Sequence, residues 1–266
     1  MAKTNDAGAQ GPIDSHIQMP KCALKQFEDK HHKYFYYDVE KKFIGNNGHA
    51  RSTNTSLNYY SWEIEQFFNS NFEKPYSKLF QQVNEITCDP PRGHIDSAFD
   101  YAAKRFVYNL NARNPQTIET RYGNPILKEY AGERELHDLG AMVSLAAEVD
   151  RDFLEDYGTT VVVNTTGTPF VLPTCGVYYL NIRDYFHAIL PVSPEKAIAF
   201  IEEQGKDSII SNGIVHVYSI EQEKDITFFN NVAFTTQIKY GVGFIVCPER
   251  KPLEIARKDF LESNSR

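Results

Sequence analysis

The sequence has few cysteines and no long apolar run. Its four cysteines, Cys22, Cys88, Cys175 and Cys247, form no C-x-x-C pair, so neither a zinc ribbon nor a redox motif is predicted. No stretch reaches the roughly 18 apolar residues of a membrane-spanning helix, and the polar start of the chain lacks the apolar core of a secretion signal. We therefore expect a cytoplasmic protein with reduced thiols and no membrane partner.

The motifs of the common enzyme classes are also missing. The chain contains no GxGxxG, P-loop, GxSxG or HExxH pattern and no internal repeat, so no metal site is predicted and the cofactor is unknown. A net charge of −7 at pH 7 argues against broad binding to nucleic acid, because such binding needs cations that face phosphates. A local basic face for nucleic acid stays open.

The chain does have enough apolar and aromatic residues for a sizeable core. Of its 266 residues, 41% are hydrophobic and 13% are aromatic. We expect one folded domain over residues 15–250. Residues 1–14 are rich in Gly, Ala, Asn and Asp, which predicts a flexible N-terminal tail, and residues 251–266 are predicted as a charged C-terminal tail.

The middle of the chain has the apolar periodicity of helices. Apolar residues recur at three-to-four spacing over 61–86, where Pro75 suits the start of a second helix, and again over 96–113. A third amphipathic stretch covers 133–157, and Gly158 is expected to end it. The sequence therefore predicts a helix-rich middle.

Strands are predicted on both sides of these helices. The segment 34–44 has aromatic residues around DVEKK and precedes a Gly-Asn turn cluster, which predicts a small hairpin. After Gly158, the segments TTVVVNTTGTPFVLP, DYFHAILPVSP and YGVGFIVCP predict further strands, whereas DITFFNNVAFTTQIKY is ambiguous. The expected fold class is α+β, a single domain in which the helix-rich middle packs against a mixed or antiparallel β region.

One helix is expected within this β-rich part, at SPEKAIAFIEEQ. Ser193 suits a helix N-cap and Pro194 suits the first helical position, with an acidic residue behind it at the positive end of the helix dipole. Ala197, Ile198 and Ile201 would then face the core.

Candidate functional residues form loose constellations. Glu133 and His137 lie four apart on an expected helix and could form an acid-base or metal pair, although such pairs are common on solvated helix faces. On the helix expected over 96–113, Arg105 and Arg113 could present cations to a phosphate-bearing substrate. The commoner explanation is that these arginines are solvated basic side chains on a helix whose start is favoured by the helix dipole.

Histidines cluster near the start of the chain. His16, His31 and His32 lie in one aromatic-rich stretch, and histidine titrates near neutral pH. Adjacent strand residues point to opposite faces, so at most one of His31 and His32 can join a given site. By contrast, the helix dipole fully explains Glu63 and Glu65 at the start of their predicted helix.

Several segments occur in an order and spacing known from bacterial proteins. They are Pro20-x-x-x-Leu24-x-x-Phe27, YFYYDVEKK, YYSWEIEQFF, the ARNP at 112–115 and ILPVSPEKAIAF at 189–200. Together they resemble the family called domain of unknown function 4238 over roughly residues 15–247, and Arg113 matches a family arginine. Some members resemble or accompany bacterial anti-phage defence genes, so the resemblance implies a biological setting without a reaction.

The chain departs from this family at two polar positions. Members typically open with His-Tyr-Val-Pro, but here Ile17 stands three residues before Pro20 and His16 lies one residue further out. Members also carry Ser-Asp-Asn-Pro after a strand, whereas Gly167 falls at the aspartate position before Pro169. Each departure removes a polar side chain from a position where the family has one.

Two functions from different classes stay open. In the first, the protein is an intracellular defence effector, such as a toxin-like nuclease, that damages nucleic acid or another essential component. His16 or His137, with Glu133, would act as acid-base, and Arg113 as an electrostatic clamp. In the second, it is a non-catalytic sensor or scaffold that recognises a phage or host component through a protein partner. A polar pocket would favour the effector, and an exposed aromatic patch would favour the sensor.

Overall fold

The computed structural model of the protein describes residues 14–53, 55–57, 59–88, 91–92, 97–114, 138, 157–182, 185–202 and 217–265. Its helical segments are α1 (Lys21–Leu24), the 3-10 turn η1 (Lys25–Phe27), α2 (Trp62–Phe68), the π-helical turn η2 (Asn69–Glu73), α3 (Lys74–Glu85), α4 (Ser97–Ala112), α10 (Glu223–Tyr240) and α11 (Arg250–Ser263). None of these helices is long and apolar enough to cross a lipid bilayer.

The strands form two larger sheets and two short ribbons. They are β1 (Asp14–His16), β2 (Tyr34–Asp38), β3 (Phe43–Gly48), β4 (Thr55–Leu57), β5 (Thr87–Cys88), β6 (Pro91–Arg92), β7 (Tyr157–Asn164), β8 (Leu172–Pro173), β9 (Tyr178–Ile182), β10 (Tyr185–Ser193), β11 (Lys196–Glu202), β12 (Val217–Ile220) and β13 (Phe244–Cys247). The larger sheets have the orders β12-β7-β11-β10-β9 and β3-β2-β13-β8. β12 runs parallel to β7, and the other pairs in these two sheets are antiparallel.

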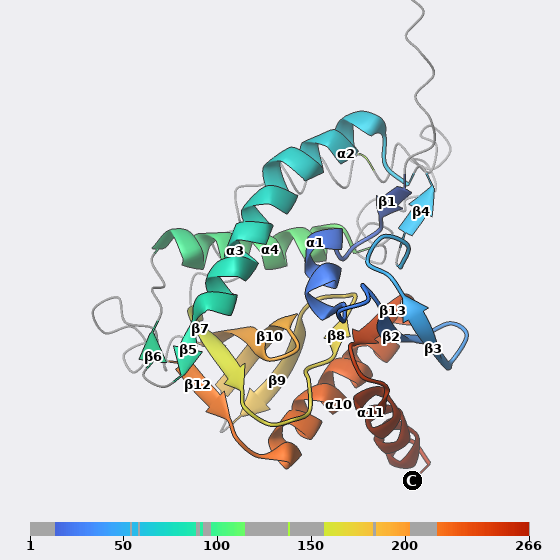
Figure 1. Cartoon of the computed structure of the whole chain (residues 1–266), viewed down its shortest axis with the longest axis vertical. Helices are drawn as coiled ribbons and strands as arrows, with labels where there is room; N and C mark the ends of the chain where they lie inside the picture. The colour runs from blue at the N-terminus through green and yellow to red at the C-terminus, as the bar shows by residue number, and fades with distance from the viewer. Residues whose placement is uncertain are drawn as a thin grey trace, which may run out of the picture.

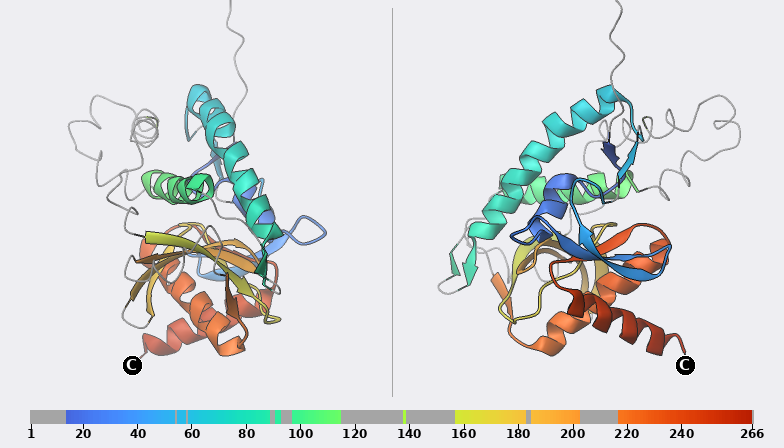
Figure 2. Two further views of the ribbon diagram at one scale, coloured as in Figure 1. Left: turned by 90° about the vertical axis from the view of Figure 1, so that its left-hand side faces the viewer. Right: turned by 45° about the vertical axis from the view of Figure 1, so that its right-hand side comes forward.

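Helices cover the two larger sheets from opposite sides (Figure 1). α3 packs on β10 and β11 and also contacts α1 and α4, while α10 and α11 pack on the other side, against β8, β9, β13 and β2. Figure 2 shows the sheets between these two sets of helices. The buried apolar residues of all these layers belong to one continuous core. The predicted α+β fold, with helices packed on a mixed β region, is confirmed.

Local signals explain where α2 and α3 begin. The hydroxyl of Ser61 accepts a hydrogen bond from the backbone N–H of Ile64 at 3.5 Å, which is the contact of a helix N-cap. Pro75 lies in the first turn of α3, where an N–H would have no helical partner. α4 occupies residues 97–112 of the predicted 96–113. The three helix predictions are confirmed.

The opening Pro-Leu-Phe spacing has a structural basis in α1 and η1. The Pro20 carbonyl accepts the backbone N–H of Leu24 at 3.3 Å as the helical turn begins. Leu24 and Phe27 are both fully buried. The spacing therefore places two large apolar side chains into the core within one short turn.

The predicted hairpin forms with its turn in the polar DVEKK segment, and the Gly-Asn cluster that follows lies in its second strand. β2 and β3 pair with Asp38 opposite Phe43, so residues 39–42 make the turn and the glycines belong to β3. Close ring packing explains the glycine at position 45 of β3, because a Cβ there would lie 2.3 Å from the Tyr36 ring. This approach requires glycine within the strand.

The helix expected after Ser193 is wrong. Ser193 ends β10 and pairs with Lys196, and Pro194 begins the tight turn into β11. The five consecutive residues 197–201 are all buried, because β11 lies between β7 and β10. A central strand buries side chains on both faces, whereas a helix would expose part of this run. The tertiary environment therefore overrides the local helix-start signal.

Two further boundaries differ from the sequence interpretation. Gly158 does not end a helix, because it lies inside β7 and pairs with Ile201. The ambiguous segment forms α10, which buries one face and ends at Gly241 in the left-handed conformation with φ 73°. The expected helix over 133–157 falls outside the described residues except for Asp138, which is helical, and Tyr157, which begins β7.

The C-terminal segment is also different from the charged tail that was expected. Residues 250–263 form α11, which buries Pro252, Leu253 and Ala256 against the sheet. Its charged residues lie on the outer face, where Arg250 and Glu254 form an ion pair at 2.7 Å. The high charge of this segment therefore belongs to the solvated face of a helix. Of residues 1–14, predicted as a flexible tail, Asp14 begins β1 and residues 1–13 lie outside the described part of the chain.

Candidate functional site

The candidate site lies where residues 15–18 meet the start of α2 and the end of α4. The Nε2 of His16 lies 2.7 Å from the Ala50 carbonyl oxygen. A carbonyl can only accept, so Nε2 carries the proton. The Tyr60 hydroxyl donates to the carbonyl of Ile17 at 3.1 Å. These hydrogen bonds hold His16 and Ile17 in place between β4 and the helices.

Arg113, directly after the last residue of α4, adds its side chain to these contacts. Its side chain is buried, its Nη2 donates to the carbonyl of His16, and its guanidinium lies 4.2 Å from the centre of the Phe68 ring and 5.3 Å from that of Tyr60. Such cation-π contacts are strongest when desolvated, at about 2 kcal/mol. We call Arg113, His16, Tyr60, Phe68 and Glu65 the Arg113 cluster.

Glu65 supplies a buried carboxylate to the Arg113 cluster. It is 9% exposed, and no ion pair joins it to Arg113 among the described residues. Within that part of the chain, neither Glu65 Oε1 nor Arg113 Nε has a hydrogen-bond partner. Burial raises the pKa of the Glu65 carboxyl, while the Arg113 charge and the Ser15 hydroxyl lower it. A buried acid and a buried base therefore share one interior region.

Two more carboxylates lie near the Arg113 cluster. Asp138 Oδ1 accepts the backbone N–H of Ser61 at 2.8 Å, next to the N-terminus of α2. Burial raises the pKa of Glu73, and the charges of Arg113 and Lys21 lower it. Arg113 is thus a buried cation whose charge acts on both Glu65 and Glu73.

The structure brings together only some of the predicted site residues. His16 and Arg113 are in contact, whereas Arg105 lies earlier on α4, with its guanidinium over Phe72. Glu133 and His137 lie outside the described residues.

Glu65 and Tyr60 were missed as site residues because their surroundings are set by tertiary contacts. The assignment of Glu65 to the helix dipole was incomplete, since its side chain is buried and faces the interior. The spacing of Ile64, Glu65 and Phe68 was the available signal, because it places the glutamate beside the apolar stripe of the helix.

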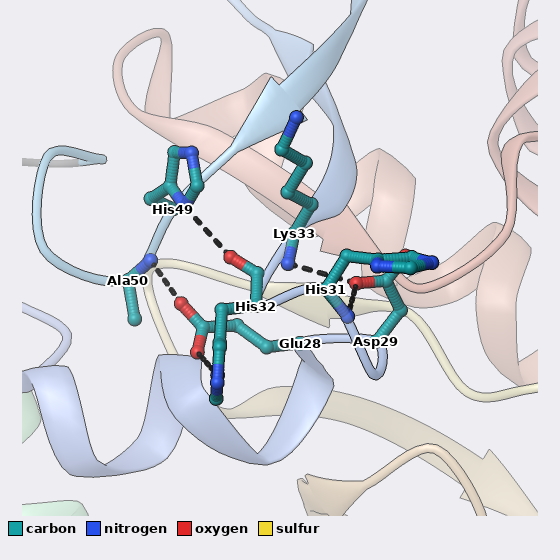
Figure 3. Close-up of polar contacts among 7 residues, drawn as sticks. All are labelled: Glu28, Asp29, His31, His32, Lys33, His49 and Ala50. Carbon is teal, nitrogen blue, oxygen red and sulfur yellow. Dashed lines mark hydrogen bonds and ion pairs between the residues drawn. The ribbon is translucent and has the colours of Figure 1, made fainter.

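The histidines at 31, 32 and 49 shape an exposed loop (Figure 3). Asp29 Oδ1 accepts the backbone N–H groups of His31 and Lys33 at 2.8 and 3.0 Å, and His49 Nδ1 donates to the His32 carbonyl at 2.7 Å. His31 and His32 lie in a turn, not in a strand, and His32 has φ 59°. In Figure 3 the three imidazole rings point in different directions. They do not converge on one site.

Comparison with models of protein families, with curated proteins and with solved structures finds no match for this chain. In the part of the chain that the structure describes, no three His, Cys, Asp or Glu side chains are grouped as a metal ion requires. Cys22, Cys175 and Cys247 are buried free thiols. Burial raises the pKa of Cys22 to about 12, which makes the reactive thiolate rare.

The raised pKa of Glu65 has a consequence for stability. Because the folded state holds this proton above the usual pKa of 4.5, the free energy of unfolding falls as pH rises from 4.5 through the raised value. Glutamine cannot ionise, so Glu65→Gln should gain stability relative to the wild type over this window. Urea unfolding between about pH 4 and pH 7 measures the difference. Glu63→Gln, exposed on the same helix, is the matched control, and a pH-independent difference for Glu65→Gln would contradict the assignment.

Proposed function

We propose that the protein is a cytoplasmic recognition component of bacterial anti-phage defence, a sensor or scaffold that binds a phage or host component and acts through a protein partner. The observation that favours recognition over catalysis concerns His16, the expected acid-base, and Arg113, the expected electrostatic clamp. Both side chains bind other parts of the fold. The Ala50 carbonyl holds the Nε2 proton of His16, and the His16 carbonyl holds the guanidinium of Arg113 between two rings. A general acid or base must reach a substrate atom, and these contacts direct both groups into the fold.

The defence setting rests on a different argument from the recognition role. It comes from the resemblance to the domain of unknown function 4238 family, carried by the Pro-Leu-Phe opening, the block around Ser193 and Arg113. The departures at Ile17 and Gly167 agree with a non-catalytic member of such a family, since both replace polar side chains.

Glutamine at position 16 separates recognition from acid-base chemistry. Its amide can donate to the Ala50 carbonyl as the imidazole does, but it cannot titrate. We expect bacteria that express His16→Gln to keep the phage protection of the wild type, with His31→Gln, an exposed histidine, as the control. Loss of protection by a His16→Gln protein with an unchanged melting temperature would contradict the recognition role.

The effector remains a second candidate because of Glu65. A buried carboxyl with a raised pKa, near a guanidinium nitrogen that has no partner among the described residues, is an arrangement that can serve proton transfer. For an effector, phage-challenged cells should show damaged RNA, DNA or metabolite pools, and Glu65→Gln should abolish the damage. Intact pools together with retained protection favour the sensor or scaffold.

A further inference from the structure

A second arginine of α4 lies at the surface between aromatic rings. The Arg105 guanidinium is 5.2 Å from the centre of the Phe72 ring and 6.0 Å from that of Tyr101. Phe67 lies 5.9 Å from Phe72, and Tyr101 and Phe67 are 52% and 41% exposed. We call Tyr101, Arg105, Phe67 and the underlying Phe72 the Arg105 surface.

The π-helical turn η2 builds one half of this surface. In an α-helix, residues five apart point in different directions, because each residue turns the chain by about 100°. The i→i+5 bonding of a π turn is wider and brings residues five apart closer to the same side. Phe67 and Phe72 are five apart, and η2 begins just after α2 ends at Phe68. The wider turn therefore brings the exposed Phe67 ring alongside the ring that supports Arg105. π turns occur frequently at functional sites.

The charge of Arg105 is open to a partner. Among the described residues Arg105 makes no ion pair, and Asp100, an acidic residue of the same helix, is bonded to Lys104 at 3.0 Å and to the Thr159 hydroxyl. Arg105 is half-buried, so its stem and one face are already packed against rings. A carboxylate that pairs with it would meet a preorganised guanidinium, which lowers the entropy lost on binding.

We infer that the Arg105 surface docks a protein partner through a carboxylate side chain flanked by apolar groups. This inference rests on the proposed recognition function. Exposed aromatic residues and arginine are the types that concentrate binding energy at protein interfaces. Nucleic acid fits less well, because it needs several cations. In the part of the chain that the structure describes, this surface has one arginine without an ion pair, on a chain of net charge −7.

A defined polypeptide can test the chemistry directly. The probe is a fluorescent random copolymer of glutamate and tyrosine, with single-stranded oligothymidylate as the competing class, both measured by fluorescence anisotropy on the full chain. We expect the copolymer to bind the wild type and Arg105→Glu or Tyr101→Ser to weaken it by roughly tenfold or more. Arg51→Glu and Tyr218→Ser, which change an exposed arginine and an exposed tyrosine elsewhere, should bind as the wild type does. Hydrogen exchange should slow in α4 and η2 on binding.

Two results would overturn the inference. One is copolymer binding that is absent or unaffected by Arg105→Glu in a folded protein. The other is tighter binding of oligothymidylate that depends on Arg105, which would assign the surface to nucleic acid. Phage protection separates this inference from the proposed function. If Arg105→Glu loses copolymer binding and keeps protection, the surface is correct and its role in defence is wrong.

Discussion

Replacing Arg113 with methionine should lower the free energy of unfolding by about 3 to 5 kcal/mol, which is the usual cost of removing one partner from a buried charge arrangement. Methionine keeps much of the side-chain length but carries no charge. The Glu65 carboxyl would then lose the nearby charge that lowers its pKa, the carbonyl of His16 would lose its donor, and the Phe68 ring would lose its stacked guanidinium.

Arg105→Met is the matched control for this substitution, since both arginines lie along α4 and both contact aromatic rings. Arg105 is half-buried and unpaired among the described residues, so its loss should cost about 1 kcal/mol or less. Urea titration of both variants gives the two values. Equal losses of unfolding free energy would show that the buried contacts of Arg113 stabilise the fold no more than those of Arg105.

Replacing Asn230 with leucine should cost about 2 to 5 kcal/mol, because it leaves two buried backbone groups without partners. Asn230 lies on α10, and its amide accepts the N–H of Val171 and donates to the carbonyl of Pro169, both at 2.9 Å. The segment from Pro169 into β8 therefore takes two of its hydrogen bonds from a helix side chain. Leucine is close in size, so the loss reports hydrogen bonding more than volume.

The neighbouring Asn231 supplies the control on the same helix turn. Its side chain is half-buried and donates to Asp259 of α11 at 2.8 Å. Asn231→Leu should cost about 1 kcal/mol, the value of one ordinary hydrogen bond. Hydrogen exchange adds a local measurement, since Asn230→Leu should speed exchange at Val171. A loss for Asn230→Leu no larger than for Asn231→Leu would mean that water replaces the amide.

Gln237 repeats this arrangement two turns further along α10. Its Oε1 accepts the N–H of Cys175 at 2.8 Å, and its Nε2 donates to the carbonyl of Val242 at 2.7 Å. These two buried amides explain why α10 was ambiguous from the sequence. They interrupt the apolar stripe of the helix at positions that face the core, so the hydrophobic period is weak although the helix is well buried.

The sequence by itself determined the elements whose signals are local. The capping serine of α2, the proline of α3, the apolar period of α4 and the β-branched run of β7 each act on residues within a few positions of one another. Capping bonds, proline geometry and side-chain crowding need no distant partner. The helices over 61–86 and 96–113 and the first strand after Gly158 were predicted correctly for that reason.

Only the tertiary structure decided the elements and site residues that depend on distant partners. The run from Ala197 to Ile201 became a strand because two other strands bury it on both sides. Arg113 meets a carbonyl 97 residues away in the sequence, at His16, and the same packing buries Glu65. Burial and long-range hydrogen bonds are set by which segments pack together. The residue pattern within one segment therefore does not predict that packing.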